Sequence, residues 1–227
     1  MRRAVAAVLF LLAACSARSA REPPPATPRP TPTPTASRPT TTSRLPDTVE
    51  LQLRIERRVA DAATEGFEEV VQDTLTDPNG WGRAGFRFAF VDEALYTVIL
   101  AEGEDVDSLC HPYDTYGLYS CQNGPIVALN ADRWRSATPE WTGDLTTYRQ
   151  MLISHEVGHL LGQHHPDVPC PASGQPAPVM AQQSTELDGC LPNPWPLAWE
   201  IACAARSDEP LAPPYEPGAV PTCGPEG

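Results

Sequence analysis

The stretch YRQMLISHEVGHLLGQHH, from Tyr148 to His165, constrains this chain more than any other part of its sequence, because it contains four of the five histidines. Its H-E-x-x-H segment sets His155 and His159 one helical turn apart on one face of a helix, with Glu156 beside them. Four apolar residues fall on the opposite face: Ile153, Val157, Leu160 and Leu161. The stretch therefore predicts a helix with one face in a hydrophobic core and the other presenting two ring nitrogens that can bind one metal ion.

Two further residues extend this pattern beyond the short motif. Gly162 lies three residues after His159, where a helix can end in the left-handed conformation that glycine adopts without steric penalty. A turn there would bring His165 round as a third nitrogen ligand. Three protein ligands are typical of catalytic Zn2+ sites, which keep the fourth tetrahedral position open for water, whereas structural sites have four. A downstream carboxylate such as Glu186 is the alternative third ligand.

Glu156 gives the expected metal site its chemistry. A site of this kind hydrolyses peptide bonds, with Glu156 as the general base that takes a proton from the attacking water and passes it to the leaving amine. The expected function is therefore that of a zinc-dependent endopeptidase. The alternative, from another class of function, is a catalytically idle zinc-binding interaction module at the cell surface.

The extended motif H-E-x-x-H-x-x-G-x-x-H resembles the signature of the metzincin metallopeptidases, in which a methionine turn follows it. Residues 177–180, Ala-Pro-Val-Met, are the candidate for that turn. The resemblance implies that Met180 lies beneath the zinc as an apolar floor and does not bind it. It also implies an α+β fold: a twisted mixed β-sheet with two long helices, a zinc cleft and an irregular, disulfide-stapled C-terminal subdomain. Pro166, directly after the third histidine, and the lack of a tyrosine two residues after Met180 separate the chain from better-known metzincins.

A second resemblance covers roughly residues 47–197. It is to an uncharacterised domain family of actinobacterial exported proteins, which has no assigned substrate. The residues that carry it are Trp81-Gly82, Cys110, Ser120-Cys121, Leu129-Asn130, Arg133-Trp134, Tyr148-Arg149, Cys170-Pro171, Gly189-Cys190 and Asn193-Pro194-Trp195-Pro196. This resemblance implies an exported domain and says nothing about the reaction.

The first 46 residues indicate export. Two arginines precede eleven apolar residues, which are too few to cross a bilayer and are typical of a secretory signal. Leu12-Ala13-Ala14-Cys15 resembles a bacterial lipobox, so we interpret residues 1–15 as a lipoprotein signal peptide with lipidation at Cys15; plain secretion is the alternative. Residues 16–46, rich in proline and threonine, are expected to form a disordered linker. The protein would then be anchored by lipid at the outer face of the cytoplasmic membrane, in the cell envelope.

Residues 47–227 suit one compact domain, which we interpret as a metzincin-like zinc metallopeptidase domain. This part holds nine of the sixteen arginines and 28 of the 29 acidic residues, a net charge of −19, and the chain has no lysine. Such a charge disfavours binding to nucleic acid or, by charge, to anionic lipid. The expected partners are a peptide or protein substrate and the membrane, the latter through the N-terminal lipid anchor. The domain is expected to be a monomer.

Hydrophobic periodicity outlines the remaining elements. Alternating apolar and polar residues predict a half-buried strand over 49–56, and a helical pattern covers 61–75. Further elements are expected as strands over 86–91, 95–100 and 126–130 and a closing helix over 195–205. The histidine helix is expected to be capped by Thr142 or Asp144. The segments 102–125 and 166–175 are too irregular for a prediction.

The cysteines support an oxidising compartment. There are seven, and lipidation of Cys15 leaves an even set of six that can pair fully. Six cysteines can pair in fifteen ways, and the sequence alone does not choose among them. Our hypothesis is nearest-neighbour pairing: Cys110 with Cys121, Cys170 with Cys190, and Cys203 with Cys223. The second pair would bracket the loop that carries Met180.

Overall fold

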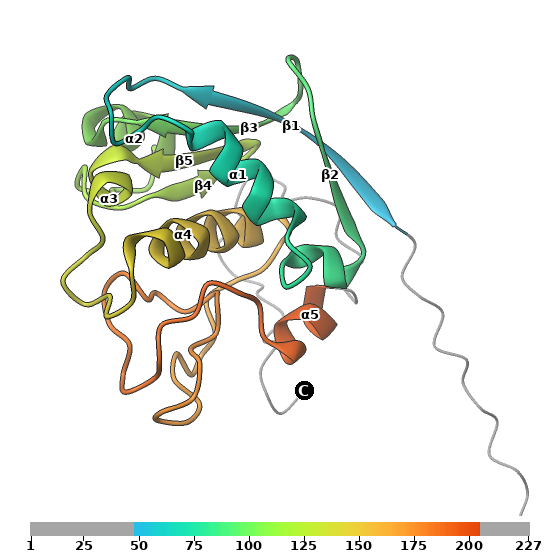
Figure 1. Cartoon of the computed structure of the whole chain (residues 1–227), viewed down its shortest axis with the longest axis vertical. Helices are drawn as coiled ribbons and strands as arrows, with labels where there is room; N and C mark the ends of the chain where they lie inside the picture. The colour runs from blue at the N-terminus through green and yellow to red at the C-terminus, as the bar shows by residue number, and fades with distance from the viewer. Residues whose placement is uncertain (1–47, 205–227) are drawn as a thin grey trace, which may run out of the picture. The chain divides into compact units, whose positions relative to one another are not determined.

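The computed structural model of the protein describes residues 48–204 (Figure 1). Cys15, the linker 16–46 and Cys223 lie outside the described residues, so lipidation and the linker stay predictions. The helices and strands, in chain order, are β1 (Val49–Arg57), α1 (Phe67–Thr76), the 3-10 helix η1 (Trp81–Ala84), β2 (Phe86–Phe90), β3 (Tyr96–Ala101), α2 (Gly103–Cys110), β4 (Cys121–Asn123), β5 (Ile126–Asn130), α3 (Ala131–Arg135), α4 (Leu145–Leu160) and α5 (Ala198–Ala204).

Five strands form one mixed sheet in the order β2-β1-β3-β5-β4. Four of them are parallel, and β4 runs antiparallel to β5 at one edge. Leu53 of β1 shows how the parallel strands overlap, because it is paired with Phe90 on one side and with Tyr96 on the other. The predicted mixed sheet is therefore confirmed, within a mixed α/β domain whose sheet is mostly parallel.

The two faces of the sheet are covered by different helices. Helices α1 and α4 pack on one face of the sheet (Figure 1). Leu53, Val98 and Leu129 point to that face and belong to the main hydrophobic core. Ile99 and Ala128, their neighbours in the strands, point to the other face, which α2 covers. Successive side chains of a strand alternate between faces, so burial on both sides explains the long apolar runs of β3 and β5.

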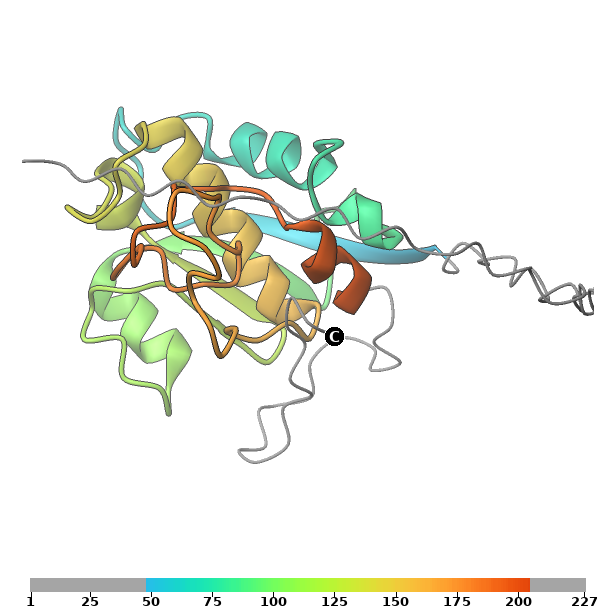
Figure 2. The ribbon, with the colours of Figure 1, turned by 90° about the horizontal axis from the view of Figure 1, so that it is seen from below.

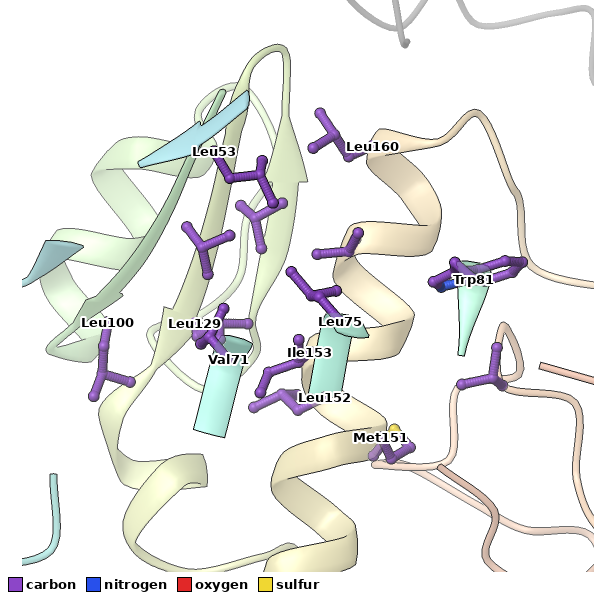
Figure 3. Close-up of a cluster of buried hydrophobic side chains, with 14 of the residues drawn as sticks. Leu53, Val71, Leu75, Trp81, Leu100, Leu129, Met151, Leu152, Ile153 and Leu160 are labelled. Atoms are coloured by element: carbon purple, nitrogen blue, oxygen red, sulfur yellow. The ribbon is translucent and has the colours of Figure 1, made fainter. Parts of the chain in front are cut away.

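Helix α4 is itself buried on two sides. Its predicted apolar face is confirmed, because Ile153, Val157 and Leu160 belong to the core under the sheet. The segment between α4 and α5 covers the opposite side, as both views of the ribbon show (Figures 1 and 2). Figure 3 shows Trp81 on that opposite side, away from the sheet residues Leu53 and Leu129. Helix α4 is therefore packed on two sides, while His159 near its end is only half-buried.

Two predicted helix boundaries are wrong. The helix predicted from Asp61 begins at Phe67, because the Asp61 carboxylate accepts the backbone N–H groups of Ala63 and Thr64 in a turn, and Gly66 is left-handed with φ 74°. Helix α1 therefore has 10 residues and only α4, with 16, is long, where two long helices were expected. The closing helix begins at Ala198 and not at residue 195. The segment 102–125, which carried no prediction, contains α2 and β4.

Between residues of the described range 48–204, two disulfides are formed, both with the predicted partners. Cys110 is bonded to Cys121, and Cys170 to Cys190. Cys203 is also disulfide-bonded, but its predicted partner lies outside the described residues, so that pairing stays a prediction. Disulfides persist in oxidising compartments, which indicates a location outside the cytoplasm. Within residues 48–204, no helix has both the length and the apolar character needed to cross a membrane.

Candidate metal centre

Both ends of α4 help to place the histidines. At its start the Asp144 carboxylate accepts the backbone N–H of Thr147 at 2.8 Å, so Asp144 is the cap. At its end Gly162 takes a left-handed conformation with φ 76°, as predicted, and the N–H of Gln163 bonds back to the carbonyl of Gly158 at 2.9 Å. The chain therefore reverses directly after the helix, and His165 returns towards it.

The ring nitrogens of three histidines meet at one point. The Nε2 atom of His155 lies 3.2 Å from that of His159 and 3.2 Å from that of His165, and the last two are 3.1 Å apart. His155 is buried, His159 is half-buried and His165 is exposed, so the cluster opens to solvent on the side of His165. Among the described residues, these three form the one group of His, Cys, Asp or Glu side chains arranged to hold a metal ion.

Backbone carbonyls hold the far side of two of these rings. The Nδ1 atom of His155 is 2.8 Å from the carbonyl oxygen of Val179, and that of His159 is 2.8 Å from the carbonyl oxygen of Gln163. A carbonyl oxygen only accepts, so each Nδ1 carries the proton and each Nε2 presents a lone pair. Two lone pairs 3.2 Å apart repel each other unless a cation lies between them.

The ionisation of the rings also suits a cation. Burial lowers the pKa of His155 to about 3, with a further contribution from His165. Burial likewise holds the pKa of His159 well below its usual range. Although the His165 side chain is exposed, desolvation within the cluster and the charge of His164 lower its pKa too. All three imidazoles are therefore neutral near pH 7, which is the form that binds a metal ion. Tetrahedral coordination at zinc–nitrogen distances of about 2.0–2.1 Å would place ligand nitrogens roughly 3.3 Å apart, close to the spacing observed.

Glu156 is next to this cluster and buried, with 6% of its surface exposed. Burial raises the pKa of its carboxyl group to about 8. No hydrogen bond or ion pair within residues 48–204 uses that carboxyl group, so it is free to exchange a proton with a water or a substrate. Glu186, the alternative third ligand, is exposed and does not join the histidine cluster.

The predicted methionine turn lies directly against α4. A side chain on Gly158, between the two helical histidines, would overlap the Met180 sulfur and lie 2.9 Å from Cζ2 of Trp81. Trp81 donates its indole N–H to the carbonyl of Ser154 at 2.8 Å, which fixes the ring against the same helix. Met180 is 2% exposed and Trp81 is 1% exposed, so the two side chains form an apolar floor under the histidine helix.

Glu200 of α5 holds this turn, and the sequence interpretation missed it. Its carboxylate accepts the backbone N–H groups of Val179 at 3.0 Å, Met180 at 2.9 Å and Leu197 at 2.7 Å. The side chain is 1% exposed, and burial raises its pKa to about 7. Because the carbonyl of Val179 orients His155, Glu200 is connected to the metal centre through one peptide. The one signal for it in the sequence is an isolated acid in the otherwise apolar helix AWEIACA.

Two further polar side chains brace the same segment. Gln183 donates to the carbonyls of Pro178 and Asn193, at 3.1 and 2.8 Å, and accepts the backbone N–H of Asn193 at 2.9 Å. Asn193 donates to the carbonyl of Ala177 at 2.7 Å. The bonds that involve Asn193 join the turn to the chain that leads into α5, and the bond from Gln183 to Pro178 lies within the turn. Together with the disulfide Cys170–Cys190, these bonds give the segment a fixed shape without regular structure.

Comparison with protein families places the chain in a group defined by its sequence. The model of a family described as protein of unknown function (DUF3152) matches residues 32–196 of the 227 residues, which is more than half of the chain. The chain belongs to this family. The match contains the three clustered histidines, Glu156 and Met180, whereas Glu200 lies four residues beyond its end. A comparison with curated proteins found no match.

Proposed function

We propose that this protein is a zinc-dependent endopeptidase of the metzincin type that acts outside the cytoplasm. The convergence of the Nε2 atoms of His155, His159 and His165 within 3.1–3.2 Å of one another carries the proposal. Zinc is the preferred metal because three imidazoles with one open position are typical of its catalytic sites. The exposed side of His165 leaves the site accessible to a substrate.

The chemistry divides between the metal and Glu156. When bound, Zn2+ supplies a Lewis acid that activates water and polarises a substrate carbonyl. The pKa of about 8 belongs to the metal-free site, and a bound Zn2+ would favour the ionised form of Glu156. In that form its carboxylate oxygen would take a proton from the attacking water and deliver it to the leaving amine nitrogen. Its burial beside His155 supports this role, because no neighbouring side chain among the described residues competes for the carboxylate.

A peptide substrate is supported by the edge of the sheet. Strand β4 is one of the two edge strands, and it packs against α4. The outer side of an edge strand presents backbone N–H and C=O groups that an extended peptide can pair with. The disulfide Cys110–Cys121 ties β4 to α2 and limits its movement. An extended chain paired along β4 would therefore run close to the helix that carries the histidines.

The proposed location is the outer face of the cytoplasmic membrane, with a lipid on Cys15. The two disulfides support an exported domain, and the lipobox-like sequence supports the anchor. A Cys15→Ser protein should leave the membrane fraction and enter the medium. Unchanged retention in the membrane fraction would rule out anchoring through this cysteine.

The proposed activity is tested by metal analysis together with cleavage-site profiling on a denatured proteome, with and without a zinc chelator. Wild-type protein should contain about one zinc per chain and cleave peptides only without the chelator. Glu156→Ala should keep the zinc and lose hydrolysis, while the matched variant Glu186→Ala should keep both. Zinc without cleavage would favour the idle binding module, and loss of zinc in Glu186→Ala would assign the third ligand to that carboxylate.

A further inference from the structure

The loop 111–120, which joins α2 to β4, exposes large apolar side chains (Figure 1). Tyr116 is 72% exposed, Leu118 51% and Tyr119 39%. All three lie within one short turn of the chain. Large apolar side chains that gather on a surface mark a site of interaction, and tyrosine is common among the residues that contribute most to binding.

The backbone of this loop is fixed from inside the domain. Buried Thr115 donates its N–H and its hydroxyl group to the Asp107 carboxylate of α2, both at 2.9 Å. The carbonyl of Gly117 accepts the side-chain amide of Asn130 at 2.9 Å, and a disulfide closes the loop at its base. The exposed side chains therefore stand on a rigid backbone, which reduces the entropy lost when they bind a partner.

Tyr116 has a backbone conformation that tyrosine rarely adopts. The carbonyl of Thr115 accepts the N–H of Leu118 at 2.9 Å in a tight turn, whose central residues Tyr116 and Gly117 have φ values of 55° and 64°. Turns with two left-handed central residues favour glycine, asparagine and aspartate, because a bulky side chain is strained there. The ring is mostly exposed, so its burial does not offset this strain. An exposed residue kept in a strained conformation indicates a role in binding.

The surroundings of these side chains are acidic. Residues 102–123 contain five acidic residues and no arginine or lysine. The Asp114 carboxylate accepts the backbone N–H of Tyr116 at 2.8 Å, so it lies beside the most exposed of the three side chains. An arginine fits a carboxylate next to an aromatic ring, because its guanidinium group pairs with the first and stacks on the second. The loop therefore suits a basic side chain of a partner better than a purely apolar one.

We propose that Asp114, Tyr116 and Tyr119, here called the tyrosine patch, bind an arginine of the substrate outside the metal centre. This inference rests on the proposed peptidase function and names its substrate class: a protein chain that carries an arginine at a fixed number of residues from the cleaved bond.

Continuity with β4 identifies the substrate as the occupant of the tyrosine patch. Tyr119 is two residues before Cys121, the first residue of β4. The outer edge of that strand is where an extended substrate would pair. A substrate longer than the three residues of β4 would pass the tyrosine patch within about 7 Å of the end of the strand.

The test measures binding and cleavage with the intact chain. Labelled dodecapeptides with one arginine at a fixed position and mixed residues elsewhere are compared with matched peptides that carry citrulline, which has a similar shape without the charge. Binding is measured by fluorescence anisotropy on Glu156→Gln protein, with each further variant in that background, and cleavage on protein with Glu156 intact. At the best position we expect arginine to bind about tenfold more tightly than citrulline and to be cleaved about tenfold faster.

Asp114→Asn removes the carboxylate of the tyrosine patch and should abolish most of this ratio. The matched control is Asp92→Asn, which removes an exposed carboxylate just after β2, at the other edge of the sheet. Both variants change the net charge of the domain equally, so the control should leave the ratio unchanged. An equal loss in both variants would mean that overall charge attracts the arginine, which overturns the tyrosine patch.

Tyr116→Asn separates binding from folding. Asparagine accepts a left-handed turn position, so this variant should unfold at the wild-type temperature or above it and still lose most of the preference for arginine. Tyr116→Phe keeps the ring and should keep the preference. An unfolding temperature of Tyr116→Asn below that of the wild type would show that the ring supports the fold, which overturns its assignment to binding.

The outcomes separate this inference from the proposed function. Cleavage without a preference for arginine, or with a preference that Asp114→Asn and Tyr116→Asn leave unchanged, overturns the tyrosine patch and leaves the peptidase standing. Arginine-selective binding that needs both residues, without any cleavage, supports the tyrosine patch and overturns the peptidase. Absence of both overturns both. A dimer of the wild-type protein in sedimentation that is lost in Tyr116→Asn would assign the surface to a second copy of the chain and overturn the substrate as its occupant.

Discussion

The sheet with its helices and the segment from 161 to 204 are held together by different forces. In the sheet half, apolar residues such as Leu53 and Leu129 pack against α1 and α4, and regular hydrogen bonding satisfies the backbone. In the later segment, polar side chains bind individual backbone groups, as the buried Glu200 does. A backbone without regular structure still needs partners for its buried groups, and here side chains provide them. The metal centre lies where the two halves meet.

Because apolar packing holds the sheet half and side-chain hydrogen bonds hold the later segment, we expect two kinds of mutational effect. Damage to the sheet half should lower the stability of the whole domain and leave the metal affinity of the folded fraction unchanged. Damage to the later segment should lower stability and metal affinity together, because that segment orients His155 through Val179 and supports α4 through Met180. Stability and zinc affinity, measured for variants in each half, test this distinction.

Glu200→Ala is expected to have the largest effect. It leaves the buried N–H groups of Val179, Met180 and Leu197 without their acceptor, so we expect a loss of about 3–5 kcal/mol in the free energy of unfolding. Zinc affinity should fall about ten- to a hundredfold, because the carbonyl that orients His155 is released. Urea unfolding and competition with a chelating dye measure the two quantities.

Leu53→Ala is the matched variant in the sheet half. It removes a fully buried side chain and should cost a similar 2–5 kcal/mol, roughly, while zinc affinity under folding conditions stays at the wild-type value. If Leu53→Ala weakens zinc binding as much as Glu200→Ala does, the metal centre depends on overall stability and the proposed division of the molecule is wrong.

The two disulfides allow a second comparison. Removing the Cys170–Cys190 bond by replacing both cysteines with alanine should cost about 3 kcal/mol and weaken zinc binding, because this bond closes the loop that carries Met180. The same replacement at Cys110 and Cys121 should cost slightly less, since their separation is 11 residues against 20, and zinc affinity should not change. Thermal unfolding and zinc titration of both double variants test this, and equal zinc affinities would argue against it.

The sequence predicted the strands of the sheet half better than the contacts made by the segment from 161 to 204. Period-two alternation located β1, and the apolar runs located β3 and β5, because local packing on the sheet determines these strands. The motif located α4 with His155 and His159, and it predicted the return of His165 after the helix. Helix α2 was missed because GEDVDSLC is mostly polar and buries only Val106 and Cys110. The start of α1 was misplaced because the left-handed Gly66 interrupts an otherwise helical pattern.

The supports of the metal centre were harder to predict, because they depend on contacts between distant residues. Glu200 is 20 residues from Met180 in the chain, and no local periodicity connects them. Trp81 lies 73 residues from Ser154, whose carbonyl accepts its indole N–H. Such contacts follow from how the irregular segment folds back on α4. They become visible only when the packing of the whole domain is known.

The raised pKa of Glu200 predicts that its contribution to the free energy of unfolding depends on pH. Burial raises its pKa from an ordinary 4.5 to about 7, so the unfolded chain releases this proton at a lower pH than the folded protein does. The contribution of Glu200 to stability is therefore complete below pH 4.5 and is lost as the pH rises through about 7. Glu200→Gln does not titrate. Between pH 4.5 and 7.5 its free energy of unfolding should increase relative to wild type by at most about 3 kcal/mol.

Urea unfolding of wild type and Glu200→Gln across this pH range measures the difference. Other titrating groups, including the three histidines and Glu156, are present in both proteins and cancel to first order. A difference that does not change with pH would mean that Glu200 is already ionised at pH 4.5. In that case its three backbone hydrogen bonds outweigh its burial.

The smallest effect is expected from one methyl group at the boundary between the halves. Gly158→Ala places a carbon against the Met180 sulfur and the Trp81 ring, so the methionine has to move away from α4. The methionine is flexible, but the Trp81 ring is held by its hydrogen bond to Ser154, so we expect a cost of about 1–3 kcal/mol with a measurable loss of zinc affinity. The control is Gly82→Ala in η1, where an added carbon meets no atom within 4 Å and should change stability by less than about 0.5 kcal/mol. A Gly158→Ala protein that loses stability and keeps its zinc affinity would show that Met180 supports the helix without influencing the metal.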